Sequence, residues 1–347
     1  YKLKGLFLTN KKRVLTGITT SGTPHIGNLA GAILPAINAS KDSSTNSFLF
    51  LADYHSLIKN NKPEITHSSS FEIASCWLAC GLDPNEVVFY RQSDVPHIFE
   101  LAWILSCLTS KGLMNRAHAY KAAVSENKSQ KNKDLDKGIS MGLFNYPVLM
   151  AADILMFNAD IVPVGQDQKQ HVEMTRDIAL RFNHHYGEIF RIPEALIPKQ
   201  AGILQGLDGR KMSKSYQNII PIFLSSEELR KHVMKIKTDS KEPGEKKDSE
   251  NSSIFNIFKA FASENETSSL LKLYEEGISW GDAKEMLFNL LDEKLTPYRE
   301  NYVDLIEDMN EVEKVLSNGA EKALDTSSPL MHKIRKSLGI KKFSDLK

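Results

Sequence analysis

The chain has 347 residues, of which 41% are hydrophobic and 25% are charged, so it can bury one large core or two medium ones. Its formal net charge of +1 argues against a protein that binds polyanions over its whole surface, although a locally basic face is compatible with it. No apolar run approaches the roughly 20 residues of a membrane span, and the N-terminus lacks the pattern of a signal peptide. We therefore expect a two-domain cytoplasmic protein that binds neither membranes nor DNA.

Residues 1–110 alternate short runs of β-branched and aromatic residues with helical patterns, which is typical of parallel βαβ units. Strands are expected at residues 14–18, 47–52 and 87–90. The helices between them are expected to begin near His25 and Ile65, and the sequence GLDP at residues 81–84 is a strong stop after the second. This part of the chain predicts an open parallel sheet.

The cysteines are Cys76 and Cys80, four positions apart in a helical pattern, and Cys107. An odd number of cysteines cannot form a complete disulfide framework, and a metal site would need more ligands nearby. We therefore interpret these residues as reduced thiols in helix cores and predict no metal site.

Residues 125–134, SENKSQKNKD, are polar and lysine-rich without periodicity, so a mobile surface loop is expected there. A lid formed by residues 125–137 over a bound ligand is the alternative, and the sequence leaves it open. A helix is expected at residues 142–157, a strand at 161–164, and a helix from about Gln166 to Phe182, which makes another βα step.

After Ser215 the pattern changes to amphipathic helices separated by charged loops, of which residues 238–248 form the longest. We expect a nucleotide-binding domain at residues 1–220, with a helical insertion at about 110–145, and a second, helical domain at residues 221–347.

The sequence GTPHIGN at residues 22–28 follows the first strand and opens a helix, which places His25 and Asn28 on the first helical turn. Free backbone N–H groups and the positive end of the helix dipole suit a polyphosphate there. Gly27 has no side chain to obstruct a base that packs on the backbone. A turn followed by a capped helix explains the same residues equally well.

The sequence KMSKS at residues 211–215 follows the turn GLDG at residues 206–209 and places Lys211 and Lys214 on a loop. Two movable ammonium groups suit the charge that develops on a departing pyrophosphate, and an exposed basic loop is the alternative. The order of the two motifs resembles that of class I aminoacyl-tRNA synthetases. The resemblance implies a doubly wound, Rossmann-like parallel sheet that carries the HIGH-like and KMSKS motifs, followed by an α-helical C-terminal domain.

The tryptophan-specific family of this class is similar to the chain over nearly its whole length. The matching segments are TGITTSG at residues 16–22, HIGN at 25–28, YPVLMAADI at 146–154, VPVGQDQKQH at 162–171, EMTRD at 173–177 and RFN at 181–183. One departure is that many family members carry Gln-Pro where this chain has Thr19 and Thr20. The resemblance implies a homodimer with L-tryptophan, ATP and tRNA(Trp) as substrates, and Mg²⁺ bound through the phosphates.

Tyr146, Met150 and Asp153 are spaced i, i+4 and i+7, so they project from one helix face. An apolar face with one carboxylate suits an indole, because the indole N–H can only donate. The resemblance implies that Asp153 accepts this N–H, and a buried structural carboxylate is the alternative. In the related tyrosine enzyme a glutamine tends to occupy the position of Met150, whereas a thioether against the ring favours tryptophan.

The resemblance also implies the remaining site residues. It places His55 beside the substrate ring, for which a structural histidine is the alternative, and Gln168 at the ammonium group of the amino acid. The expected catalytic residues are His25, Asn28, Lys211 and Lys214. The expected ATP-binding residues are Thr19, Thr20, Ser21, Gly27, Asn28, Gly165, Gln166, Asp167, Ile203, Lys211, Met212, Ser213, Lys214 and Ser215. The expected tryptophan-binding residues are His55, Tyr146, Met150, Asp153, Val162, Val164 and Gln168.

Residues 331–347 carry a basic cluster against a single acidic residue, Asp345. The cluster consists of Lys333, Arg335, Lys336, Lys341, Lys342 and Lys347. A surface that contacts tRNA phosphates and a solvated helix end both explain it.

Three other functions share some of these features. Met150 argues against a tyrosine-specific synthetase, and the presence of every motif histidine and lysine argues against a catalytically silent RNA-binding relative. A small-molecule nucleotidyltransferase would share the HIGH-like turn, but it would not need a helical C-terminal domain of this size.

Overall fold

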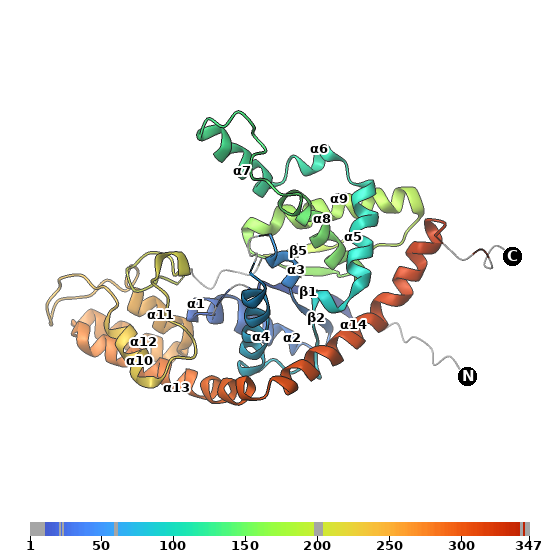
Figure 1. The fold of residues 1–347 in the computed structure, drawn as a ribbon. Coiled ribbons are helices and arrows are strands. Elements are labelled where there is room, and N and C mark those ends of the chain that lie inside the picture. The colour runs from blue at the N-terminus through green and yellow to red at the C-terminus, as the bar shows by residue number, and fades with distance from the viewer. Residues whose placement is uncertain are drawn as a thin grey trace.

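The computed structural model describes residues 11–20, 22, 24–58, 62–197, 204–340 and 343. In this part of the chain, five strands form one sheet in the order β3-β2-β1-β4-β5, and every neighbouring pair is parallel. The strands are β1 (Lys12–Ile18), β2 (Thr45–Leu51), β3 (Val88–Arg91), β4 (Ile161–Pro163) and β5 (Glu194–Leu196). The predicted doubly wound parallel sheet is confirmed, and it lies at the centre of Figure 1.

The sheet is buried on both faces, as a parallel sheet requires. Successive side chains of a strand point to opposite faces, so Leu49 and Leu51 of β2 belong to one apolar core, while Phe48 and Phe50 belong to the other. The strands therefore have short runs of apolar and aromatic residues, which is why the sequence predicts β1 to β4. The sequence did not predict β5, because it has three residues, begins with an exposed Glu194 and shows no pattern of its own.

Helices connect the strands and cover the sheet. Between β1 and β4 they are α1 (Ile26–Asn28), a π-helical turn (Leu29–Ile33), α2 (Leu34–Ser40), α3 (Asp53–Ser56), α4 (Pro63–Ala79), a 3-10 turn (Gln92–Asp94), α5 (Pro96–Leu108), α6 (Lys111–Met114), α7 (His118–Ser129) and α8 (Met141–Met156). After β4 they are a 3-10 turn (Gln166–Gln168), α9 (Lys169–Tyr186), a 3-10 turn (Lys214–Tyr216), α10 (Ser226–Met234), α11 (Ser253–Phe261), α12 (Glu264–Glu276), α13 (Trp280–Glu307) and α14 (Met309–Ser337).

Three local predictions were wrong. The polar segment at residues 125–134 is not a loop throughout, because α7 continues to Ser129 and the buried Asn127 donates from Nδ2 to the carbonyls of Leu135 and Lys137, both at 2.9 Å. Cys107 is exposed rather than in a helix core, unlike Cys76 and Cys80. The helix predicted to end at Phe182 runs to Tyr186, where Gly187 at φ +89° ends it.

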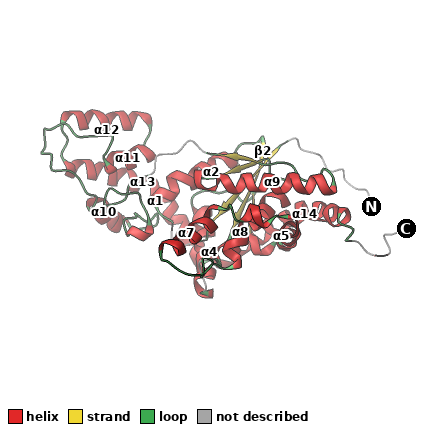
Figure 2. Ribbon diagram, turned by 90° about the horizontal axis from the view of Figure 1, so that it is seen from above, coloured by secondary structure: helices red, strands yellow, loops and turns green. Residues whose placement is uncertain are grey.

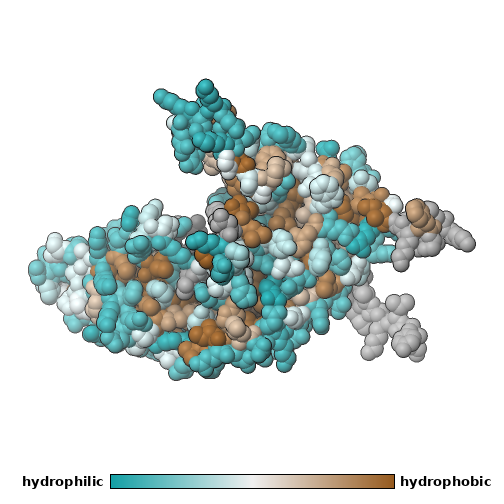
Figure 3. Space-filling view, viewed as in Figure 1, coloured by the Kyte–Doolittle hydropathy of each residue, from teal (hydrophilic) through white to brown (hydrophobic). Residues whose placement is uncertain are grey.

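Helix α7, which lies within the predicted helical insertion, projects from the body of the protein (Figure 1). Figure 1 shows α7 standing out at the top, and Figure 3 shows that this projection has a hydrophilic surface above a hollow with hydrophobic patches on its wall. Figures 1 and 2 both set α10, α11 and α12 apart from the sheet. Within the described residues, no helix has the length and apolar character needed to span a membrane.

Helix α14 returns from the helical region to the sheet (Figure 1). Its Val312 and Leu316 belong to one apolar core, whereas its Ala323 and Met331 belong to the other. Glycine is needed where it crosses β3, since a Cβ on Gly319 would lie 1.7 Å from the carbonyl oxygen of Phe89. Helix α14 belongs to the second predicted domain but packs against the sheet of the first. The division of the chain at residue 220 therefore stays a prediction.

Gly319→Ala is therefore expected to lower the free energy of unfolding by about 1–3 kcal/mol, the usual cost of overpacking, although alanine is the better helix former. Urea denaturation measures this change. Gly31→Ala is the matched control, because a Cβ there meets no atom within 4 Å. Equal stability of the two variants would contradict the close approach of α14 to β3.

Candidate active site

The predicted site residues gather at the carboxyl ends of the strands. His25 follows β1, His55 follows β2, and Gly165 follows β4. The sheet reverses its order between β1 and β4, and ligands of open α/β sheets bind at such a switch point. The sheet therefore places the HIGH-like turn and the predicted amino-acid pocket at one edge.

The two sequence motifs lie in contact. A Cβ built on Gly22, which has φ +64°, would lie 2.8 Å from Nζ of Lys214. The backbone N–H of Ile26 donates to the carbonyl of Ile220 at 2.9 Å, and His25 forms a β-bridge with Pro221. The segment that follows KMSKS is thus paired with the segment that opens the HIGH-like helix, which brings a lysine to a helix N-terminus suited to phosphate.

His25 lies in this contact, with 8% of its surface exposed. Burial, followed by the charge of Lys214, lowers the pKa of His25 to about 4. Its Nδ1 has no hydrogen-bond partner among the described residues, and Asn28 Oδ1 accepts from its backbone N–H at 3.1 Å. At neutral pH the ring is therefore uncharged and able to donate a hydrogen bond to a ligand.

This pKa makes stability depend on pH. Because the folded value, about 4, lies below the ordinary 6.5, the unfolded chain takes up the proton first as the pH falls. The contribution of His25 to the free energy of unfolding is complete above pH 6.5 and is lost as the pH falls toward 4. His25→Gln should lose less of its unfolding free energy across this window, which urea titrations at several pH values measure. A slope equal to that of the wild type would contradict the assignment.

Asn218, which the sequence did not single out, holds the KMSKS loop in shape. Its Oδ1 accepts from the backbone N–H of Ser213 at 2.8 Å, and its Nδ2 donates to Asp208 Oδ1 at 2.6 Å and to the carbonyl of Lys211 at 3.1 Å. Hydrogen bonds from Asn218 and Arg210 lower the pKa of Asp208 to about 2. Asn218 itself is 2% exposed, so the loop is built around a buried amide.

Asp153 lies at the centre of the predicted tryptophan pocket and is wholly buried. Its Oδ2 is 2.8 Å from His55 Nε2, and Gln92 Nε2 donates to its Oδ1 at 2.7 Å. Burial raises the pKa of Asp153 above its ordinary value, and the hydrogen bonds from His55 and Gln92 and the charge of His55 offset only part of this rise. Gln92 was missed by the sequence analysis, although a polar residue directly after a buried strand is a signal that could have found it.

A second chain of hydrogen bonds begins on the same helix face. The Tyr146 hydroxyl is 2.8 Å from His171 Nε2, and His171 Nδ1 is 2.8 Å from Gln168 Oε1. Since an amide oxygen only accepts, His171 donates from Nδ1 and accepts from Tyr146 at Nε2. Gln168 Nε2 donates to Asp167 Oδ2 at 2.8 Å. His171, another residue without a predicted role, thus orients Tyr146 and Gln168 together.

The other predicted site residues differ in exposure. Of the residues near the HIGH-like turn, Thr19 is exposed, and Thr20 is buried with an Oγ1 that has no partner among the described residues. Around the amino-acid pocket, Val162 is buried, while Met150 and Val164 are half-buried. Exposed residues are Gly165, Gln166, Asp167, Lys211 and Ser215, whereas Ser213 is half-buried. Met212 is buried and would lie 3.4 Å from a Cβ on Gly27. Ser21 and Ile203 lie outside the described residues.

The basic C-terminal cluster is partly used inside the protein. Lys333 Nζ donates to the carbonyl of Glu188 at 3.1 Å, and Arg335 Nε donates to Glu100 at 2.7 Å. Lys341, Lys342 and Lys347 lie outside the described residues. Lys333 and Arg335 therefore anchor α14 to the segment that follows α9 and to α5.

A parallel sheet of this order, with the HIGH-like turn and the KMSKS loop in contact at its switch point, is the arrangement of a class I aminoacyl-tRNA synthetase. The chain belongs to the family of tRNA synthetases class I (W and Y), whose family model matches residues 8–296.

Two similar proteins and one similar structure are tryptophan-specific. The chain is 52% identical over 332 residues to the tryptophan–tRNA ligase of Neisseria meningitidis, covering 96% of this chain and 99% of the relative. It is 54% identical over 334 residues to that of Xanthomonas axonopodis, covering 96% and 77%. The structure of tryptophanyl-tRNA synthetase from Campylobacter jejuni, complexed with ADP and tryptophan, superposes with a TM-score of 0.84 at 43% identity, covering 94% and 99%.

Proposed function

We propose that this protein is a ligase that joins L-tryptophan to tRNA(Trp) in two steps. In the first, a tryptophan carboxylate oxygen attacks the α-phosphorus of ATP, the bond to the β-phosphate breaks, and pyrophosphate leaves. In the second, the hydroxyl at the 3′ end of the tRNA attacks the carbonyl carbon of the adenylate, and AMP leaves. No side-chain nucleophile is needed, because the attacking carboxylate is already ionised. Catalysis then consists of positioning and electrostatic stabilisation.

The phosphate side of the site supplies nitrogen donors. Lys214 lies at the N-terminus of the HIGH-like helix, with the uncharged His25 beside it, and we assign Lys211 and Asn28 to the same phosphates. The adenosine side is assigned to the residues that follow β4, Gly165 to Asp167. Mg²⁺ favours carboxylate and phosphate oxygens, and these motif side chains offer none, so we propose that the ion enters as part of the MgATP substrate.

The single observation that carries the choice of tryptophan is the buried Asp153 carboxylate on the apolar face of α8. The identity of 52–54% to named tryptophan–tRNA ligases supports the same choice. An indole N–H is a donor without an acceptor function, and a buried carboxylate held by His55 and Gln92 is an acceptor matched to it. We assign Tyr146, Met150, Val162 and Val164 to the walls of the pocket.

Pyrophosphate exchange with each proteinogenic amino acid tests this function. We expect exchange with tryptophan and background rates with tyrosine and phenylalanine. Exchange with tyrosine alone would replace the proposal by a tyrosine-specific synthetase. Absence of exchange with any amino acid, in a protein that still binds tRNA, would replace it by a non-catalytic RNA-binding relative.

We also propose that the protein acts as a homodimer in the cytoplasm. Trp103 on α5 is 73% exposed and borders a groove of about 430 Å³ that Tyr54, Phe99 and Leu149 also line. An apolar groove around an exposed tryptophan is typical of an interaction surface, and a second copy of the chain is the occupant that we propose. Sedimentation should give the mass of a dimer, and Trp103→Glu should give a monomer. A wild-type monomer would contradict this assignment.

A further inference from the structure

The carboxylate of Asp153 is held by two partners of different chemistry. His55 contributes an imidazole nitrogen, whereas Gln92 contributes an amide that cannot titrate. Gln92 has no exposed surface, and its Oε1 has no hydrogen-bond partner among the described residues. The orientation of its amide is fixed all the same, because Oε1 facing Asp153 would set two acceptors against each other. The buried amide is therefore committed to a single donation, from Nε2 to Asp153 Oδ1 at 2.7 Å.

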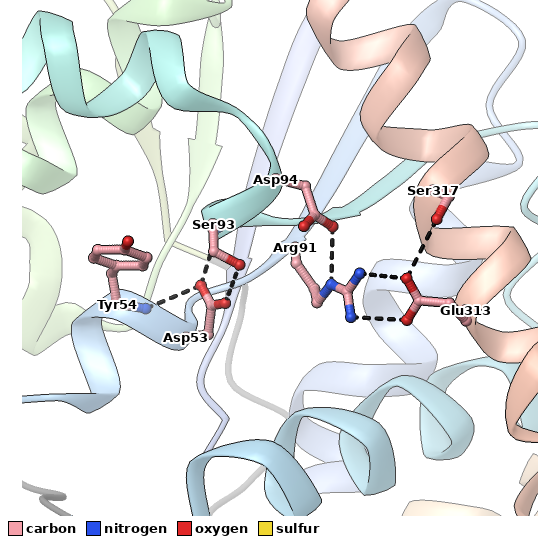
Figure 4. Close-up of polar contacts among 7 residues, drawn as sticks. All are labelled: Asp53, Tyr54, Arg91, Ser93, Asp94, Glu313 and Ser317. Atoms are coloured by element: carbon pink, nitrogen blue, oxygen red, sulfur yellow. Dashed lines mark hydrogen bonds and ion pairs between the residues drawn. The ribbon is translucent and has the colours of Figure 1, made fainter. Parts of the chain in front are cut away.

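The segments that carry these partners are tied to each other outside the pocket. Asp53, just before His55 in α3, accepts from both the hydroxyl and the backbone N–H of Ser93, the residue that follows Gln92 (Figure 4). His55 and Gln92 then converge on Asp153. The contacts form a closed ring in which the Asp53–Ser93 contact fixes the separation of the two groups that hold the carboxylate.

The residue on the other side of Gln92 is tied as well. Arg91 donates to both carboxylate oxygens of Glu313 on α14, at 2.8 and 2.6 Å, and its Nε donates to Asp94 at 2.8 Å (Figure 4). Bidentate pairs of this kind fix geometry as well as contribute energy. Gln92 is therefore held between two polar anchors, which gives its side chain little freedom to leave Asp153.

We propose that Gln92 is a positioning residue for amino-acid selection, which keeps Asp153 ionised and turned toward the indole N–H by a donation that does not depend on pH. The inference rests on the proposed function. A buried carboxylate without donors takes up a proton, and a protonated Asp153 would present a hydroxyl hydrogen where an acceptor is needed. Three titratable groups act on Asp153: His55 and Asp53 from α3, and the buried Tyr90 from β3.

Two substitutions of Gln92 separate this role from a structural one. Gln92→Leu keeps the volume and removes the donor, so KM for tryptophan in pyrophosphate exchange should rise roughly 10-fold, the loss expected for one hydrogen bond to a charged group. KM for ATP should stay within about 2-fold, since no ATP contact is removed. The affinity for tryptophan should fall further as the pH falls, because Asp153 protonates at a higher pH without its donor.

Gln92→Glu should show the opposite dependence on pH. Two carboxylates at this distance share one proton, and the protonated partner can donate to the other as the glutamine does. The affinity for tryptophan should therefore recover as the pH falls. If Gln92 merely filled space, its two substitutions would not change tryptophan affinity in opposite directions as the pH falls. If Gln92→Leu does not fold, the pH dependence of tryptophan affinity in Gln92→Glu alone decides. A pH dependence parallel to that of the wild type would overturn the proposal.

Asn183→Leu is the matched control for the loss of a buried amide. Asn183 is 6% exposed, and its side chain bonds the backbone of Ile189 and Phe190 at the far end of α9. The Asn183→Leu substitution should lower the melting temperature without changing the pH profile of the KM for tryptophan. A wild-type enzyme that does not exchange with tryptophan would refute the proposed function. If the wild type exchanges with tryptophan but the Gln92 variants keep its tryptophan KM and pH profile, only the role of Gln92 is refuted.

Discussion

Lys214→Ala is expected to slow adenylate formation by about 10²- to 10³-fold, the loss typical of removing one donor that meets charge developing in a transition state. Lys214 is at the N-terminus of the HIGH-like helix, against Gly22 and beside His25. The negative charge that it meets grows as pyrophosphate leaves. The dissociation constant for tryptophan should change by less than about 2-fold, because an interaction made only in the transition state alters rate and not ground-state binding. Single-turnover kinetics and equilibrium titration measure the two quantities.

Lys231→Ala serves as the control for the loss of one positive charge. Lys231 is exposed on α10 and pairs with Glu227 at 2.6 Å, so its removal should leave both quantities unchanged. Equal losses of rate and of tryptophan binding in Lys214→Ala would contradict the assigned role, since they would indicate that Lys214 supports the fold of the site.

Asp153→Asn is expected to weaken tryptophan binding by roughly 10- to 150-fold, which corresponds to about 1.5–3 kcal/mol for a charge-assisted hydrogen bond. ATP affinity should barely change. An amide has only one oxygen, whereas Oδ1 and Oδ2 of Asp153 are each occupied, by Gln92 and His55. The substituted amide would therefore offer an acceptor to only one of these partners and turn a donor toward the other, which sets two donors against each other where that partner is Gln92. Asp153→Ala should cost more, because the indole N–H and both partners then lose their acceptor.

An analogue of tryptophan with sulfur in place of the indole nitrogen provides the cross-check. It has no proton to donate, so the wild type should reject it strongly, and Asp153→Ala should discriminate much less between it and tryptophan. Circular dichroism establishes whether the variant is folded. If a folded Asp153→Ala keeps full discrimination, Asp153 is structural and the specificity argument fails.

The sequence predicts those parts of the protein that have a local signal. Apolar runs mark β1 to β4, and the KMSKS and HIGH-like motifs are contiguous. Spacing alone sets Tyr146, Met150 and Asp153 on one helix face, in agreement with their place in α8. The roles of these residues in binding stay predictions, because they depend on ligands.

The residues that the sequence missed act through contacts that exist only in the folded chain. Gln92 follows β3 and reaches Asp153 on α8, 61 positions further along the chain, and Asn218 contacts Asp208 and Ser213 only once this loop has folded back on itself. The place of Gln92 directly after a buried strand marks it as a candidate, but no local pattern identifies Asp153 as its partner or indicates the contacts of Asn218. The helical start of residues 125–134 was missed for another reason: the segment is polar all round and rich in Ser and Asn, so it shows neither an apolar stripe nor a strong helix propensity.

The crossing of α14 over β3 also bears on synthesis of the chain. β3 is the last strand on its side of the sheet, and the Phe89 carbonyl there meets Gly319, 230 positions further along the sequence. An uncovered edge strand can pair with other chains. During translation the edge strand emerges long before the helix that covers it, so the nascent chain exposes a template for aggregation until residues 309–337 leave the ribosome. Helix α14 thus protects the edge of β3, and this role is separate from any contact that the helix makes with tRNA.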